Sequence, residues 1–199
     1  MNIVHVEVRK ETVLNIAITS KEAILERSRE RMKKDGWMAV NIRGLAEDCG
    51  VSVGTIYNYF DSKSDLLAAT IESIWQDIFH FEELGKPFQS FTDCVWRIFD
   101  SMKKGDERYP EFFQSHPISF MGEEKQNGKE RMEQSWKHMK EGMHQALIQD
   151  ENVSAEVFDN VFTSEKFVDI IFSLILSAQV TRNYDCSEIL EMISRVIYR

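Results

Sequence analysis

The stretch from Asn41 to Lys63 constrains the fold of this chain more than any other part of its sequence. Two short helices can cross closely only if the first helix has a small residue at the crossing, the turn accepts a left-handed backbone, and the second helix supplies an apolar side chain. Ala46, Gly50 and Ile56 meet these three needs in order. The stretch therefore predicts a helix, a tight turn and a second helix that packs against the first.

The outward-facing side chains of this predicted hairpin suit contact with a DNA backbone. A helix-turn-helix places its second helix in the major groove. Ser52 is expected to cap that helix, and Gly54 removes a side chain where a phosphate backbone would come close. Thr55, Tyr57 and Lys63 can each donate a hydrogen bond to a phosphate oxygen, which sets register without reading sequence.

Two further side chains of the second helix can read bases. Asn58 can pair with the edge of an adenine, and Val53 can contact a thymine methyl group. The residues predicted to bind double-stranded DNA are Asn41, Arg43, Ser52, Val53, Gly54, Thr55, Tyr57, Asn58 and Lys63.

The chain resembles the TetR/AcrR family of transcriptional repressors in one ungapped run, Gly50-Val51-Ser52-Val53-Gly54-Thr55-Ile56-Tyr57-Asn58-Tyr59-Phe60-Asp61-Ser62-Lys63, followed by Leu66 and Leu67. With the preceding helix, the resemblance covers residues 19 to 67. It implies an amino-terminal three-helix domain that binds an operator as a homodimer. It also implies a divergent remainder that binds a small-molecule effector and dimerises through its last two helices.

Two residues depart from the family pattern. Asn41 stands where the family commonly has Ser or Thr, and Asn also caps a helix well. Gly44 replaces a polar helix former and should weaken its helix by ~1 kcal/mol relative to Ala. We expect Gly44 to let that helix sit closer to DNA.

The formal net charge of -9 argues at first sight against a nucleic-acid ligand. Residues 19–66, however, hold eight basic and eight acidic side chains, whereas residues 67–199 hold 14 basic and 23 acidic ones. The acidic excess therefore lies outside the predicted DNA-binding segment.

The rest of the chain predicts further helices and no strand-rich region or repeat. Apolar residues recur at helical spacing in five segments, over residues 62–84, 91–104, 123–149, 163–180 and 187–198. Thr19 with Glu22 and Asp185 with Glu188 have the spacing of capping boxes. The predicted fold is all-α, with an amino-terminal arm at residues 1–18, a helix-turn-helix domain at residues 19–66, and a larger helical effector-binding and dimerisation domain at residues 67–199.

Aromatic residues are concentrated between Phe79 and Phe120, beyond what a small core requires. They predict a pocket for an apolar or aromatic effector, and ordinary core packing is an alternative of equal standing. The predicted pocket residues are Phe91, Trp96, Phe99, Phe112, Phe113, Trp136 and Met139.

The helix that contains Phe167 to Val180 is apolar over more than one stripe, so it should be covered on two sides. A second copy of the chain would supply one cover. The predicted dimer interface consists of Phe167, Ile171, Leu174, Ile175, Ala178, Ile189, Met192 and Ile193.

Several other classes of protein find no support in the sequence. It has no Gly-rich phosphate loop and no constellation of an activated nucleophile, so we expect no enzyme and no cofactor. His138 and His144 are spaced so that one helix cannot aim both at one metal ion. We expect no metal.

The predicted location is the cytoplasm. Cys49, Cys94 and Cys186 are odd in number and far apart, which favours reduced thiols. No stretch suits a membrane span or a secretory signal. Two other hypotheses stay open: an acidic, helical protein-interaction module that no longer binds DNA, and a ligand-binding or catalytic helical protein.

Overall fold

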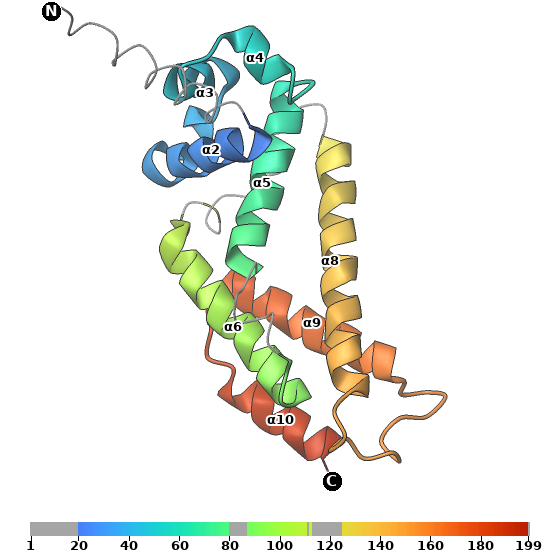
Figure 1. The fold of residues 1–199 in the computed structure, drawn as a ribbon. Helices are drawn as coiled ribbons and strands as arrows, with labels where there is room; N and C mark the ends of the chain where they lie inside the picture. The colour runs from blue at the N-terminus through green and yellow to red at the C-terminus, as the bar shows by residue number, and fades with distance from the viewer. Residues whose placement is uncertain (1–19, 80–86, 111, 113–124, 199) are drawn as a thin grey trace, which may run out of the picture. The chain divides into compact units, whose positions relative to one another are not determined.

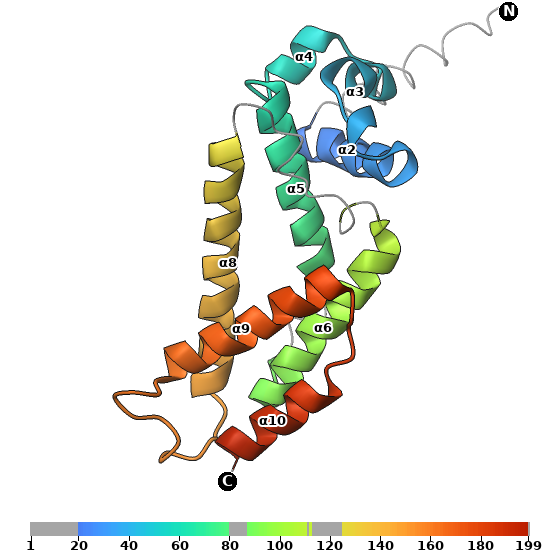
Figure 2. The same cartoon turned by 180° about the vertical axis from the view of Figure 1, so that it is seen from behind.

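A computed structural model describes residues 20–79, 87–110, 112 and 125–198, and within those residues it contains helices and no strand (Figures 1 and 2). The all-α prediction is confirmed. The predicted arm and Phe113 lie outside the described residues. The chain divides into two compact units, which we call unit 1 (residues 1–74 and 114–128) and unit 2 (residues 75–113 and 129–199).

Unit 1 contains the predicted helix-turn-helix. Its described elements are α2 (Lys21–Asp35), the 3-10 helix η1 (Trp37–Ala39), α3 (Ile42–Cys49), α4 (Val53–Tyr57) and the first part of α5 (Lys63–Phe79). Ser20 caps α2, because its hydroxyl accepts the Ala23 N–H at 3.1 Å. The helix thus begins one residue later than the predicted box at Thr19.

The core of unit 1 forms where α2, α3 and α4 gather around α5 (Figure 1). Its fully buried side chains include Ile24, Leu45, Ile56 and Leu66. A buried hydrogen bond of 2.7 Å between the hydroxyls of Ser28 and Thr70 ties α2 to α5. This packing gives α3 and α4 a fixed support.

Unit 2 contains the last turns of α5, α6 (Phe91–Arg108), most of α8 (Lys125–Ile148), α9 (Ser164–Thr181) and α10 (Ser187–Ile197). Its core is one cluster of buried residues from α6, α8, α9 and α10. The capping box predicted at Asp185 is wrong. Asp185 accepts the N–H and the hydroxyl of Ser187 at 3.0 and 2.6 Å, while Cys186 occupies the cap position without a side-chain bond.

The described residues can also be searched for metal sites, membrane-spanning helices and reactive cysteines. They include no group of three or more side chains that could hold a metal ion. None of the described helices combines the length and apolar character that a membrane span needs. All three cysteines are buried free thiols, and burial raises the pKa of Cys94 to about 12. A thiol that stays protonated is a poor nucleophile.

Candidate nucleic-acid interface

The turn between α3 and α4 has the geometry that the sequence predicted. Gly50 adopts φ 65° and ψ 31°, the left-handed conformation, and the Val51 N–H donates to the Ala46 carbonyl at 2.9 Å. Ala46 and Ile56 are 3% and 0% exposed, as expected for the residues predicted at the helix crossing. The helix-turn-helix is confirmed.

The start of α4 is fixed by Ser52. Its hydroxyl accepts the Thr55 N–H at 3.1 Å and lies 2.9 Å from the Thr55 hydroxyl. Both side chains are therefore engaged in capping, and Thr55 is half-buried. Their contribution to DNA binding would be to present the helix start, where backbone N–H groups point outward.

The outer surface of α4 carries the residues predicted to meet DNA. Val53 is 39% exposed and Tyr57 is 50% exposed, and Asn58 is exposed directly after the helix. A Cβ atom built on Gly54 would meet no side chain closer than the Ser52 Oγ at 3.6 Å. The neighbouring atoms of the chain therefore leave room for a side chain at position 54. The predicted reason for glycine here is the close approach of a DNA backbone.

The remaining predicted DNA contacts differ in their surroundings. Arg43 on α3 and Lys63 at the start of α5 are exposed. Asn41 makes two hydrogen bonds within the chain, because Oδ1 accepts the Gly44 N–H and Nδ2 donates to the Ala39 carbonyl, both at 2.9 Å. Asn41 is therefore the cap of α3.

Gly44 contradicts its predicted role. It is buried, and a Cβ atom at this position would collide with the guanidinium group of Arg31, whose Nη2 atom would lie 2.8 Å away. Gly44 therefore makes room for Arg31 and does not bring α3 closer to DNA.

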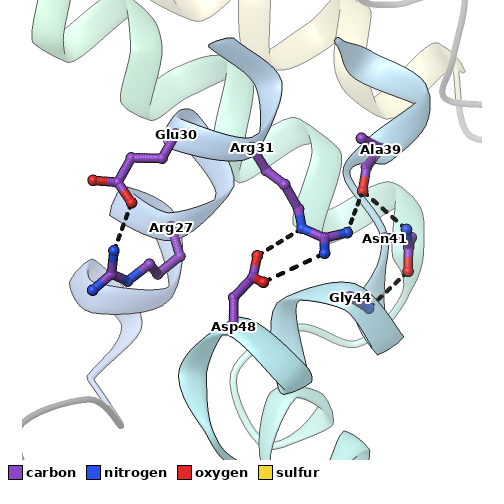
Figure 3. Close-up of polar contacts among 7 residues, drawn as sticks. All are labelled: Arg27, Glu30, Arg31, Ala39, Asn41, Gly44 and Asp48. Carbon is purple, nitrogen blue, oxygen red and sulfur yellow. Dashed lines mark hydrogen bonds and ion pairs between the residues drawn. The ribbon is translucent and has the colours of Figure 1, made fainter. Parts of the chain in front are cut away.

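Arg31 is the important residue that the sequence reasoning missed (Figure 3). From α2, its Nε donates to Asp48 Oδ2 at 2.6 Å, and its Nη1 donates to the Ala39 carbonyl at 3.0 Å. The hydrogen bond with Asp48 raises the pKa of the guanidinium. The signal in the sequence was an unexplained glycine inside a helix, with an arginine available on the preceding helix.

The aromatic residues predicted to line an effector pocket do not behave alike. Phe91, Phe99 and Phe112 are at most 3% exposed, whereas Trp96 is 49% exposed and does not belong to an enclosed lining. Trp136 and Met139 pack half-buried against the core of unit 2. A ligand among these residues would have to displace packed side chains.

Most of the predicted dimer interface lies inside unit 2 itself. Five of the eight residues are no more than 8% exposed and belong to the core, so they cannot meet a second copy: Phe167, Ile171, Ile175, Ala178 and Ile193. Leu174 and Ile189 are half-buried, and Met192 is 38% exposed. The buried residues of α9 lie on one face of the helix, which packs against the core of unit 2.

Other apolar residues of the last two helices face outward. Ile170 is 48% exposed and Val180 is 81% exposed on α9. On α10, Met192 is 38% exposed and Val196 is half-buried. These side chains remain available to a partner.

Comparison with known proteins agrees with this architecture. Residues 24–70 match the family model described as "Bacterial regulatory proteins, tetR family". The HTH-type transcriptional repressor KstR of Mycolicibacterium smegmatis is 30% identical in an alignment of 107 residues, which covers 45% of this chain and 52% of the repressor. The match thus spans about half the length of that relative.

Two solved structures share the fold over most of the chain. The transcriptional regulator FadR from Bacillus subtilis, in complex with stearoyl-CoA, has a TM-score of 0.60 and 18% identity, covering 88% of this chain and 96% of FadR. The regulator SCO7222, a TetR from Streptomyces coelicolor, has a TM-score of 0.54 and 17% identity, covering 88% of this chain and 77% of the regulator. At these identities the likeness shows the fold alone.

Proposed function

Since the chain belongs to the TetR family of transcriptional regulators, we propose that it is a repressor that binds double-stranded operator DNA and leaves it when a small-molecule effector binds unit 2. The observation that carries this proposal is the outer surface of α4. That helix is held from behind by Ile56 and exposes Val53, Gly54 and Tyr57 in front. A rigidly held helix with such a face suits the major groove.

Charge on the same unit supports a phosphate contact. Arg43 and Lys63 are both exposed, on α3 and at the start of α5. They flank α4 in the sequence. With α4 in the major groove, they would neutralise phosphates on either side of that groove. If Arg43 and Lys63 supply the phosphate contacts, we expect modest salt dependence for a DNA-binding protein.

We also propose that the protein acts as a homodimer through the outward faces of α9 and α10. One short recognition helix gives little affinity, and two half-sites about 34–36 Å apart are read only by a pair. The exposed Ile170, Val180 and Met192 are the apolar side chains that a second copy would cover.

In this proposal the effector acts by a population shift. The dimer would have two conformations, one in which the recognition helices fit successive major grooves and one in which their spacing does not fit. An effector that binds the second conformation more tightly lowers operator affinity, and the ratio of its affinities for the two conformations sets the size of the effect. Because Phe91 and Phe99 are closely packed, effector entry would be coupled to movement of α6.

The proposal is tested by selecting duplexes from a random-sequence library and measuring affinity by gel shift for the sequence most enriched. We expect a two-fold symmetric motif. Tyr57→Phe should weaken binding to all sequences alike, whereas Asn58→Ala should relax preference at one base pair by ~1–3 kcal/mol. Val161→Ala, at a residue 78% exposed in unit 2, is the control and should bind normally.

Failure of the unaltered protein to enrich any sequence would refute the proposal and favour a protein-interaction module. Identical binding profiles for Tyr57→Phe and Asn58→Ala across the library would contradict the roles assigned to those two residues.

A further inference from the structure

We infer that Arg31 is a positioning residue for DNA binding: it fixes α3 against α2, and through α3 it sets the orientation of the recognition helix α4 without touching DNA itself. This inference rests on the proposed function. The experiment below therefore distinguishes a failure of this inference from a failure of the proposed function.

The guanidinium group of Arg31 joins three elements of unit 1 (Figure 3). Arg31 projects from α2, and it donates to the carboxylate of Asp48 on α3 through Nε at 2.6 Å and Nη2 at 3.4 Å. Its Nη1 donates to the Ala39 carbonyl in η1 at 3.0 Å. A planar fork with fixed donor directions holds its acceptors in a defined geometry, which the single ammonium group of a lysine would not do.

These contacts act near both ends of α3. Asp48 lies in its last turn, whereas Asn41 caps its first turn by accepting the Gly44 N–H. Asn41 also donates to the Ala39 carbonyl, the same oxygen that Arg31 uses. The chain of bonds from Arg31 therefore restrains α3 against both sliding and rotation on α2.

The orientation of α4 depends on that of α3. α4 spans five residues, Val53–Tyr57, and it packs against α3, to which it is joined by the tight turn at Gly50. A helix this short gains little stability from its own hydrogen bonds. A shift of α3 would therefore be passed on to the side chains of α4.

Gly44 shows how closely the guanidinium is fitted. The three atoms nearest to a Cβ at this position all belong to Arg31, and glycine inside a helix is unfavourable by ~1 kcal/mol relative to Ala. The Arg31 side chain is 23% exposed. By contrast, Arg27 on the same helix pairs with Glu30 within α2 at 2.7 Å, and its side chain is 49% exposed. Arg27 thus provides a matched control, since its ion pair joins no second element.

The experiment compares Arg31→Met with Arg27→Met. Thermal melts by circular dichroism first establish a temperature at which each variant is fully folded. At that temperature, affinity is measured over a range of salt for the duplex that the unaltered protein enriches most from a random-sequence library. We expect Arg31→Met to bind about tenfold more weakly, the scale of coupling between contacting residues, and Arg27→Met to bind normally.

The dependence of affinity on salt separates positioning from phosphate contact. Because Arg31 touches no phosphate in this scheme, the slope of log affinity against log salt should be unchanged in Arg31→Met. A slope reduced by about one phosphate contact would overturn the inference and make Arg31 part of the DNA-binding surface.

Gly44→Ala tests the same contact from the other side. In the unaltered protein the new methyl group should displace the guanidinium and weaken DNA binding about as much as Arg31→Met. In the Arg31→Met background, Gly44→Ala should cause no further loss of affinity. Equal losses in both backgrounds would contradict the role given to Arg31.

Two results distinguish the failures. If the unaltered protein enriches no sequence, the proposed function fails and the inference fails with it. If the unaltered protein binds DNA and folded Arg31→Met binds equally well, with only its melting temperature lowered, Arg31 is merely structural and the inference alone fails. Should Arg31→Met not fold, Asp48→Asn provides the same comparison with the guanidinium still present.

Discussion

The carboxylate of Asp150 joins separate parts of unit 2 and offers a quantitative test of its packing. Asp150 follows α8 and is 8% exposed. Its Oδ2 accepts the Phe91 N–H at the start of α6 at 2.8 Å and the Tyr198 hydroxyl after α10 at 2.6 Å, and its Oδ1 accepts two N–H groups of Asn152 at 3.1 Å. We predict that Tyr198→Phe destabilises the protein measurably.

The expected size follows from these contacts. The hydroxyl is bonded to an ionised group at a distance typical of a charge-assisted hydrogen bond, which contributes ~1.5–3 kcal/mol. The three other bonds to Asp150 remain in the variant, so no buried charge is left without a partner. We therefore expect the free energy of unfolding to fall by about 1.5 kcal/mol at pH 7, at the low end of that range.

The effect should depend on pH. Burial alone would raise the pKa of Asp150, but the hydrogen bonds from Tyr198, Phe91 and Asn152 outweigh burial and lower it. A carboxyl group whose pKa is lower in the folded state stabilises the protein above its unfolded pKa of about 3.9, and that stability is lost as the pH falls toward the folded value. The destabilisation by Tyr198→Phe should therefore be full at pH 7 and shrink below about pH 4.

Urea denaturation followed by circular dichroism measures both quantities. Tyr57→Phe is the control, because Tyr57 is 50% exposed and loss of its hydroxyl should change the free energy of unfolding by less than about 0.5 kcal/mol. A Tyr198→Phe variant as stable as this control, or one whose deficit is the same at pH 7 and at pH 3.5, would refute the reasoning.

Three further predictions concern unit 2. Gly142→Ala should raise the free energy of unfolding by ~0.5–1 kcal/mol, because Gly142 is exposed within α8 and a Cβ there meets nothing within 4 Å; an unchanged melting temperature would contradict this. Arg182 adopts φ 53° and donates to Asp106 at 2.9 and 3.0 Å. Arg182→Gly should relieve backbone strain but destabilise the protein overall, because the Asp106 carboxylate loses its ion pair. Adding Asp106→Asn should restore part of the stability in thermal melts. Ile170→Arg should yield a monomer in analytical ultracentrifugation while Val161→Arg stays dimeric; a dimer in both would place the interface elsewhere.

The helix-turn-helix could be predicted because its determinants are local. Ala46, Gly50 and Ile56 lie within one short stretch, and each is needed for a steric reason that does not depend on distant residues. The cap at Ser52 likewise reaches Thr55, only three residues away. Periodicity was sufficient for the other helices as well, since an amphipathic helix shows its buried stripe in its own sequence.

The partner of an apolar helix face could not be predicted in the same way. The wide arc of apolar residues on α9 predicted cover on two sides, one of them by a second copy of the chain. However, Phe167 and Ile175 face the core of their own unit, and Ile170 faces outward. Periodicity shows which residues are removed from water, but hydrophobic burial is non-directional and does not distinguish a neighbouring helix from a second copy.

Three of the helix glycines, at positions 44, 54 and 142, show the same limit on a smaller scale. In the sequence each is an equal interruption of helix propensity, and propensity alone suggests the same cost for each. In the structure, Gly44 is filled by the guanidinium of Arg31, a residue on another helix, whereas Gly54 and Gly142 face open or ordinary surroundings. Gly44 is thus fitted to a contact between helices, whereas a requirement for Gly54 would come from a molecule outside the chain. Substitution of Gly44 should therefore change stability and, under the proposed function, affinity for DNA, whereas substitution of Gly54 should change affinity alone.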